Sequence, residues 1–216
     1  SQTHQNLLRA FAGESQARNR YTFAAGLAKR KNLHVIEAVF TFTADQERAH
    51  AKVYYDLLES LSGKNIQIDG TYPVDIFPGV LEHLRAAQHN EYQEWEHDYA
   101  HFADVAREEG FSEIAKTFDM IADIEKVHGD RFGRFADLLE SEKLFVSDVK
   151  VQWMCLNCGM VIESTRHVPG VQARPGLVHP HGDGSLPLKK SPASHAGLFL
   201  CQGSGCSRGR TTVLNM

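Results

Sequence analysis

Two copies of a Glu-x-x-His motif lie 78 residues apart in this chain of 216 residues. They are Glu47–His50 and Glu125–His128, and each lies in a stretch with helical periodicity. A spacing of three residues places both side chains of a motif on one face of a helix. One carboxylate and one imidazole from each of two helices, with single glutamates from two more, are typical of a carboxylate-bridged di-metal site in a four-helix bundle. The pattern therefore predicts such a bundle, with a site suited to redox chemistry on dioxygen or a peroxide.

Four long amphipathic segments fill the first two-thirds of the chain, at roughly residues 4–31, 33–61, 80–109 and 112–143. Asn32 is expected to end the first helix in a left-handed conformation, and Gly110 is expected to close the third. Short loops there make two antiparallel helix pairs, and residues 64–78, with two prolines, form one long crossover. We expect an all-α, ferritin-like bundle over residues 1–146 and a small irregular or β module over residues 147–216.

The first two helices repeat as the last two. Residues 21–50 align with residues 99–128 without a gap, and nine positions are identical, including both Glu-x-x-His pairs. This duplication predicts a bundle with pseudo-twofold symmetry and equivalent ligands from both halves. A single Glu-x-x-His motif is usually a surface pair, but two copies in register favour a di-metal site.

The repeat also predicts the remaining carboxylates. The position equivalent to Glu14 is Tyr92, one residue after Glu91, and a π-bulge in one helix would produce this slip. Glu14 and Glu91 are thus expected as equivalent bridging or terminal ligands. Glu94 faces the same way as Glu91 and has no counterpart in the first helix, so one metal is expected to exchange ligands as its oxidation state changes. Tyr21 and Tyr99 are either ordinary core residues or hydrogen-bond donors to metal-binding carboxylates.

Charge and cysteine content limit the partners. Residues 1–150 carry 17 Lys and Arg against 25 Asp and Glu, a net charge of −8, whereas residues 151–216 have a net charge of +4. An acidic main domain argues against nucleic acid as a partner. The sequence has no signal-like start and no apolar run long enough to span a membrane, so we expect a cytoplasmic protein. Four cysteines, two of them in a Cys-x-x-Cys pair, favour reduced metal ligands over disulfides.

The chain strongly resembles the rubrerythrins over roughly residues 4–163. The motifs that carry the resemblance are AFAGESQARNRY (10–21), TADQERAH (43–50), EYQEW (91–95), AREEGF (106–111) and WMCLNCG (153–159). The resemblance implies a non-haem di-iron site that reduces hydrogen peroxide to water, and a rubredoxin-like module that delivers electrons from one iron on four cysteines. It also implies that His50 and Glu94 exchange at one iron. The di-iron ligands that it implies are Glu14, Glu47, His50, Glu91, Glu94, Glu125 and His128.

The C-terminal module departs from that family. Its first knuckle, Cys155 to Cys158, is present, but residues 164–200 contain no cysteine. The remaining pair, Cys201 and Cys206, has a spacing that does not suit a second metal knuckle. Three interpretations stay open: an expanded iron or zinc site on all four cysteines, a site that uses Cys155 and Cys158 with His179 or His181, or loss of the second half of the module. We favour the last, because the likeness stops abruptly, as it would if the tail were encoded out of frame.

The ligand pattern together with the resemblance therefore implies a di-iron peroxidase that uses two iron ions and a rubredoxin-type electron donor in defence against oxidative stress. A second hypothesis is a ferritin-like ferroxidase or iron-storage protein, and a third is a non-catalytic metal-binding protein. Glu94 and the Cys-x-x-Cys pair distinguish the first from the second, because storage requires neither. Apolar residues on more than one helix face predict a homodimer.

Overall fold

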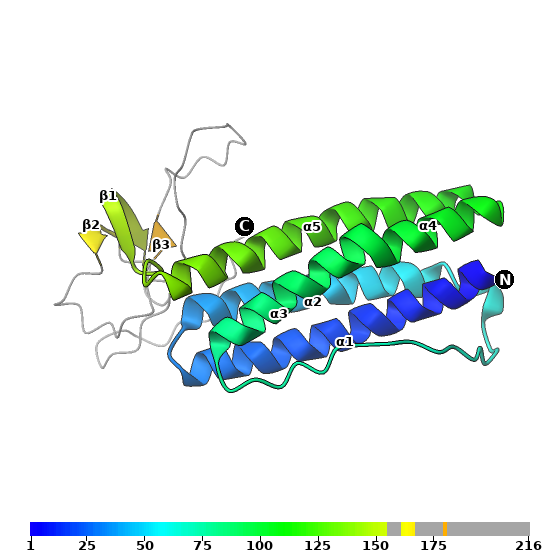
Figure 1. Cartoon of the computed structure of the whole chain (residues 1–216), viewed down its shortest axis with the longest axis horizontal. Coiled ribbons are helices and arrows are strands. Elements are labelled where there is room, and N and C mark those ends of the chain that lie inside the picture. The colour runs from blue at the N-terminus through cyan, green and yellow to red at the C-terminus, as the bar shows by residue number, and fades with distance from the viewer. Residues whose placement is uncertain (155–160, 167–178, 181–216) are drawn as a thin grey trace. The chain divides into compact units, whose positions relative to one another are not determined.

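The computed structural model describes residues 1–154, 161–166 and 179–180 of the chain. Its helices confirm the predicted four-helix arrangement, with the third helix built from three consecutive segments (Figure 1). They are α1 (Gln2–Arg30), α2 (His34–Asp56), α3 (Val80–Gln93), the π-helical η2 (Glu94–Asp98), α4 (Tyr99–Glu108) and α5 (Ser112–Glu140). The residues at the junctions of α3, η2 and α4 all have right-handed helical backbone angles, so these three segments form one continuous helix.

The helix ends follow local backbone chemistry. Asn32 has a φ of 59°, which confirms the left-handed conformation predicted there, and Gly110, which closes the third helix, has a φ of 84°. The second helix is shorter than predicted: α2 ends at Asp56, and a 3-10 turn, η1 (Glu59–Leu61), follows before Gly63. The fourth helix also ends earlier, at Glu140.

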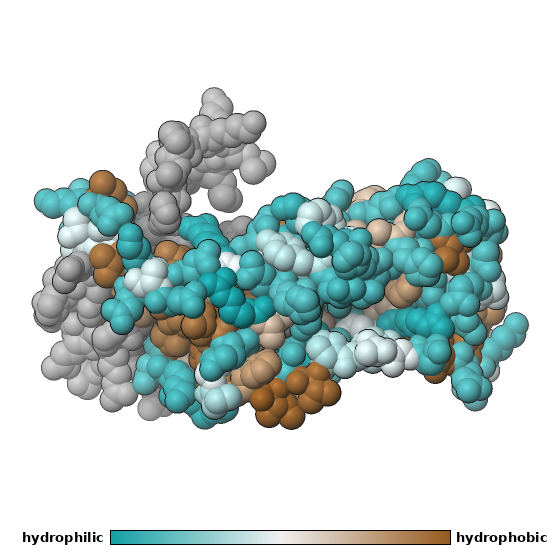
Figure 2. All heavy atoms as spheres, viewed as in Figure 1, coloured by the Kyte–Doolittle hydropathy of each residue, from teal (hydrophilic) through white to brown (hydrophobic). Residues whose placement is uncertain are grey.

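The crossover between η1 and α3 has no helix or strand and runs alongside the helices in Figure 1. Several of its apolar side chains face solvent, and Val74 and Ile76 are 80% and 85% exposed. Figure 2 shows apolar atoms gathered on the lower edge of the view, where the crossover passes in Figure 1. The crossover is therefore held by polar contacts, which are described below, more than by burial of its own apolar groups.

Two aromatic clusters in the helical core reflect the internal repeat. In the first, the ring centroids of Tyr21, Phe40 and Phe132 lie 5.0–5.9 Å apart. In the second, those of Tyr99, Phe118 and Tyr54 lie 5.1–6.0 Å apart. Each residue of one cluster is 78 positions from its counterpart in the other, so the duplication extends from the sequence into the packing of the core.

The chain separates into two compact units, residues 1–24 with 40–137 and residues 25–39 with 138–216. The first unit contains the predicted metal ligands of the bundle. The second includes an antiparallel sheet of order β2-β1-β3, formed by β1 (Val146–Met154), β2 (Val161–Arg166) and β3 (His179–Pro180). Trp153 is buried there and donates a hydrogen bond from Nε1 to the carbonyl of Ser164, at 2.8 Å. The division at residue 146 into a bundle and a rubredoxin-like module stays a prediction.

Candidate metal centre

Six of the seven predicted bundle ligands converge in two overlapping groups. Glu14, Glu47, His50 and Glu125 form one group, and Glu47, Glu91, Glu125 and His128 form the other. Within each group one potential ligand atom from every residue lies within 4.8 Å of all the others, and every residue is buried. Glu47 and Glu125 belong to both groups. The arrangement can therefore hold two ions that share two carboxylates, with one further carboxylate and one imidazole for each.

The helices position these side chains by simple periodicity. Glu47 and His50 lie one turn apart on α2, as Glu125 and His128 do on α5, so each motif presents its two groups to the same interior space. Glu14 comes from α1 and Glu91 from α3. The two imidazole rings stack with their centroids 5.5 Å apart and their planes inclined by 16°.

The imidazole nitrogens point at the shared carboxylates. His50 Nδ1 lies 2.9 Å from an oxygen of Glu125 and 3.5 Å from one of Glu47. His128 Nδ1 lies 2.6 Å from Glu125 and 3.1 Å from Glu47. These contacts lack hydrogen-bond geometry, and both oxygens of Glu47 and of Glu125 have no hydrogen-bond partner among the described residues. Buried acceptors that are left without donors are costly, and bound cations would satisfy them.

The pKa values also reflect the buried negative charge of these carboxylates. Burial and the negative charge of Glu125 raise the pKa of Glu14 well above its usual range. Burial and Glu47 raise the pKa of Glu91 to about 8. Burial acts to lower the pKa of His128, but the carboxylates of Glu125, Glu47 and Glu91 outweigh it and raise the value to about 12. These raised pKa values mark a concentration of buried negative charge, and so the donor set fits a pair of divalent or trivalent ions.

Two tyrosines hold the outer carboxylates. The hydroxyl of Tyr99 donates a hydrogen bond to Glu14 Oε1 at 2.6 Å, and the hydroxyl of Tyr21 donates one to Glu91 Oε1. Each pair links residues from different helices, and the two pairs are related by the internal repeat. The structure therefore places both tyrosines where a hydroxyl orients a potential ligand.

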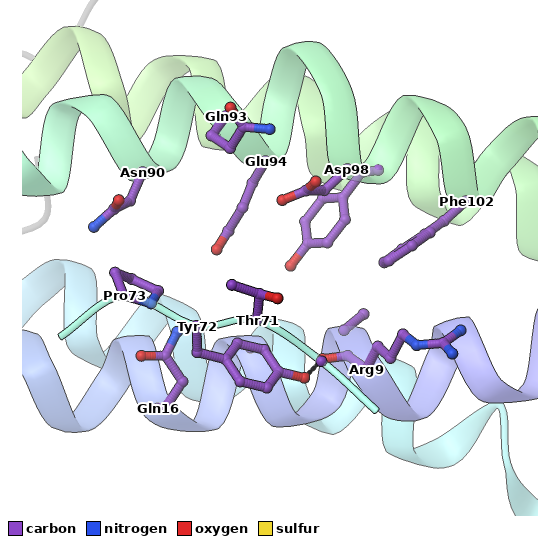
Figure 3. Close-up of a pocket in the computed structure, with 14 residues that line it drawn as sticks. Arg9, Gln16, Thr71, Tyr72, Pro73, Asn90, Gln93, Glu94, Asp98 and Phe102 are labelled. Atoms are coloured by element: carbon purple, nitrogen blue, oxygen red, sulfur yellow. Dashed lines mark hydrogen bonds between the residues drawn. The ribbon is translucent and has the colours of Figure 1, made fainter. Parts of the chain in front are cut away.

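Glu94 lies outside both groups. It is the first residue of η2, and its carboxyl group lines a cavity between the helices and the crossover (Figure 3). Burial and the carboxylates of Glu91 and Glu14 raise its pKa well above the usual range. Glu94 was predicted as a ligand together with the other six residues. In the structure it belongs to neither of the two groups in which those six converge.

The other predicted ligands cannot be placed. Cys155, Cys158, Cys201 and Cys206 lie outside the described residues, as does His181, and of His179 only the backbone is described. Among the residues that are described, the two Glu and His groups are the clusters that could hold a metal ion.

Sequence reasoning missed one buried polar residue near the centre. Tyr54 of α2 looks like one of the apolar positions of its helix, yet its hydroxyl is buried without a hydrogen-bond partner among the described residues. The carboxylates of Glu14 and Glu125 help burial to raise its pKa. A comparison with its repeat partner, Phe132, would have identified it.

The bundle holds two overlapping groups of buried residues, each with three glutamates and one histidine. This arrangement defines a ferritin-like protein with a di-iron type of carboxylate site. The family model named Rubrerythrin matches residues 5–136, and the chain belongs to this family. It is 41% identical over 180 residues to a rubrerythrin of Porphyromonas gingivalis, and the aligned residues cover 83% of this chain and 87% of that one. It is 42% identical over 165 residues to a rubrerythrin of Nitratidesulfovibrio vulgaris, and the aligned residues cover 76% of this chain and 85% of that one.

Solved structures show the same fold at lower sequence similarity. A fully reduced nigerythrin has a TM-score of 0.57 and 24% identity, and the match covers 82% of this chain and 83% of that one. A bacterioferritin of Mycobacterium tuberculosis also has a TM-score of 0.57, with 20% identity and coverage of 65% and 87%. Among the described residues, no helix is long and apolar enough to cross a membrane.

Proposed function

We propose that this protein is a peroxidase that reduces hydrogen peroxide to water at a di-iron site in the helical bundle. The observation that carries the proposal is Glu94: a fifth carboxyl group, and seventh potential ligand, lies beside a complete six-residue set, on one side only, and faces a cavity. A site that only binds and stores iron does not need this additional group. We propose the six converging residues as ligands of the two irons and Glu94 as a ligand that exchanges with His50.

The irons would supply the two electrons that cleave the oxygen–oxygen bond, and their charge would stabilise the developing hydroxide. The chain itself has to hold the site dry, orient the ligands and supply two protons for each peroxide. Tyr99 and Tyr21 orient Glu14 and Glu91 through their hydrogen bonds. Glu94 is the carboxyl group that lines the cavity beside these ligands, so we propose it as the group that passes a proton to the substrate.

We further propose that electrons come from a rubredoxin-type donor, that the protein acts in the cytoplasm in defence against oxidative stress, and that it is a homodimer. Residues 147–216 would be the remnant of an electron-transfer module whose second half is lost. Iron analysis tests that point, because loss of the module predicts two irons per chain. A third tightly bound iron with a thiolate charge-transfer band would instead show an intact cysteine site.

The decisive experiment is anaerobic. The iron-loaded, reduced protein is mixed separately with hydrogen peroxide and with air-saturated buffer. The absorbance of the ferric site reports the rate of reoxidation. We expect peroxide to react much faster. An equal or faster reaction with dioxygen, with iron accumulating beyond two per chain, would identify a ferroxidase, and no reaction with either would identify a non-catalytic metal-binding protein.

A matched pair of variants tests the role of Glu94. Glu94→Gln should retain two irons but slow the reaction with peroxide by about tenfold or more, since one ionisable group typically contributes at least this much to a proton-transfer step. Glu96→Gln, in the same segment but facing solvent, should react as the wild-type protein does. Equal rates in the two variants would remove Glu94 from the mechanism.

A further inference from the structure

A cavity of about 430 Å³ lies between α1, the crossover and the helix that contains η2. Figure 3 shows Glu94, Asp98 and Phe102 along one side of it, and Thr71 and Tyr72 of the crossover along the other. Glu94 and Tyr99 both line it, and Tyr99 donates a hydrogen bond to Glu14 in the metal centre. The cavity is thus lined by Glu94 and by a tyrosine that contacts Glu14 of the metal centre.

The crossover forms a fixed outer wall because ionic contacts anchor it on both sides of this segment. Asp69 pairs with Arg9 of α1 at 2.6 Å, and Arg9 Nε also donates a hydrogen bond to the Asp69 carbonyl at 3.0 Å. On the other side, Asp75 pairs with Arg20 of α1 and accepts a hydrogen bond from Asn90 Nδ2 at 2.9 Å. Both side chains of the Asp75–Arg20 pair are almost buried.

Tyr72 lies between these two anchors. Its hydroxyl donates a hydrogen bond to the carbonyl of Arg9 at 3.0 Å, drawn as a dashed line in Figure 3. A Cβ atom at Gly70 would lie 2.9 Å from the Tyr72 ring, and one at Gly13 would lie 3.7 Å from it. Glycine at position 70 therefore lets the ring lie close against the chain at the outer wall of the cavity.

The lining suits a small uncharged polar molecule. Neutral side chains that can donate and accept hydrogen bonds, those of Gln16, Asn90 and Gln93, line the cavity together with the carboxyl groups of Glu94 and Asp98. Arg9 also lines the cavity, and its charge is offset by the paired Asp69. A water molecule's share of liquid volume is about 30 Å³, so a cavity of about 430 Å³ easily admits a molecule as small as hydrogen peroxide. Its size alone does not exclude larger hydroperoxides.

We propose that this cavity is the route by which hydroperoxides reach the metal centre, and that Tyr72 is the residue that restricts the route to small ones. The inference rests on the proposed peroxidase function and names the substrate class and its specificity-determining residue. Tyr72 acts by size: its ring occupies the outer wall between two anchored points, where a bulky alkyl group would otherwise enter.

Two variants in the full-length, iron-loaded protein test the route. Tyr72→Ala removes the ring, and Thr71→Trp adds bulk to the same wall. The control is Ile76→Ala, which shortens a residue of the crossover that is 85% exposed and does not line the cavity. For each protein we would measure kcat/KM for hydrogen peroxide and for cumene hydroperoxide. A second measurement, independent of peroxidase activity, is the anaerobic rate at which 2,2′-bipyridine removes ferrous iron.

Tyr72→Ala should raise kcat/KM for cumene hydroperoxide relative to hydrogen peroxide by about tenfold or more, within the range that pocket shape provides. It should also speed iron removal by bipyridine, whereas Thr71→Trp should slow iron removal and the reaction with both peroxides. Ile76→Ala should leave all three rates unchanged.

An unchanged peroxide ratio and unchanged iron removal in Tyr72→Ala would overturn the proposal. The same changes in Ile76→Ala would also overturn it, because they would reflect a loosened crossover. If the wild-type protein reduces neither peroxide but iron removal responds to both cavity variants, the peroxidase function fails and the route to the metal centre stands.

Discussion

Glu109 is a residue whose role follows from its contacts and not from its local sequence. Glu108 and Glu109 look like solvated charges at the end of a helix. In the structure the Glu109 carboxylate accepts hydrogen bonds from the backbone N–H groups of Gln2 at 2.9 Å and Thr3 at 2.8 Å. It thus caps the first turn of α1, and that turn has no acidic residue of its own.

This cap predicts a pH dependence of stability. Hydrogen bonds from Thr3 and Gln2 lower the pKa of Glu109 to about 2 from an ordinary value of 4.5. A lowered folded-state pKa stabilises the protein above pH 4.5, and this contribution is lost as the pH falls toward 2. Glu109→Gln should therefore lower the melting temperature at pH 7 by a few degrees, and the difference from wild type should shrink between pH 4.5 and pH 3. Glu108→Gln should show no such convergence in the same thermal scans.

Tyr54 is the position at which the two aromatic clusters differ. Its counterpart in the repeat is Phe132, and the other two residues of each cluster are identical in type. The hydroxyl of Tyr54 is buried without a hydrogen-bond partner among the described residues. Such a group costs free energy that a phenyl ring of the same shape would not.

Tyr54→Phe should therefore raise the free energy of unfolding by about 1 kcal/mol, measured by urea titration of the metal-free protein. The reciprocal change, Phe132→Tyr, should lower it by about 1–3 kcal/mol because it buries a new hydroxyl. A loss of stability in Tyr54→Phe would mean that the hydroxyl has a partner in solution.

The π-helical segment η2 explains a one-residue discrepancy in the internal repeat. Tyr21 lies seven positions after Glu14, but Tyr99 lies eight positions after Glu91. The additional residue is accommodated in η2, between the two positions, so the predicted bulge is confirmed. Both the carboxylate and the tyrosine can then face the site in each half.

The same segment determines where Glu94 lies. Counted from Glu91, its counterpart in α1 is the buried Ala17; counted from Tyr99, its counterpart is Gln16, which lines the cavity. We infer that η2 keeps Glu94 at the cavity and away from a position that accepts only a small residue.

Deleting the exposed Glu96 tests this inference, because it would restore an α-helical register in which Glu94 matches Ala17. The deletion should lower the free energy of unfolding by about 3 kcal/mol, since a carboxyl group would enter a position occupied by alanine in the other half. Adding Glu94→Ala should recover most of the loss. Circular dichroism during urea unfolding measures both, and no recovery in the double variant would contradict the account.

The crossover depends on two Arg–Asp pairs that differ in burial. The side chains of Arg20 and Asp75 are 12% and 13% exposed, whereas Asp69, paired with Arg9, is 93% exposed. A charge that loses its partner is costly when buried and nearly neutral when solvated.

Asp75→Asn should therefore destabilise the protein by about 3 kcal/mol, because Arg20 would remain buried without a counter-ion. Asp69→Asn removes the same charge from the same segment and should cost less than about 1 kcal/mol. Chemical denaturation of the two variants compares them directly, and equal losses would show that burial does not distinguish the pairs.

At the scale of the whole molecule, the buried charges of the metal centre link folding to metal binding. The shared carboxylates Glu47 and Glu125 lie with two other buried carboxylates in the interior of the bundle. This concentration of buried negative charge is unfavourable for folding until cations offset it. Ions that bind only the folded state add directly to its stability.

Removing the metals with a chelator should therefore lower the melting temperature. Restoring ferrous iron at 100 times its dissociation constant should return about 2.7 kcal/mol for each site. Glu47→Gln should lose this metal-dependent increment, whereas Glu96→Gln should keep it. Equal melting temperatures with and without metal, by calorimetry, would show that the six residues do not bind it.

Sequence periodicity alone determined the four helices, the long crossover and the pairing of each glutamate with a histidine. These features are local: a helix repeats every 3.6 residues, so a spacing of three is enough to place two side chains together. The duplication added Glu14, Glu91 and the π-bulge, because related segments fold alike.

Only the tertiary structure decided which carboxylates the two groups share, that Glu94 lies apart from them at a cavity, and that Glu109 caps a helix more than 100 residues away in sequence. These features depend on distances between helices, and side chains from different helices meet by packing, which no local spacing encodes. The same holds for Tyr54, whose missing hydrogen-bond partner is a property of its neighbours and not of its own helix.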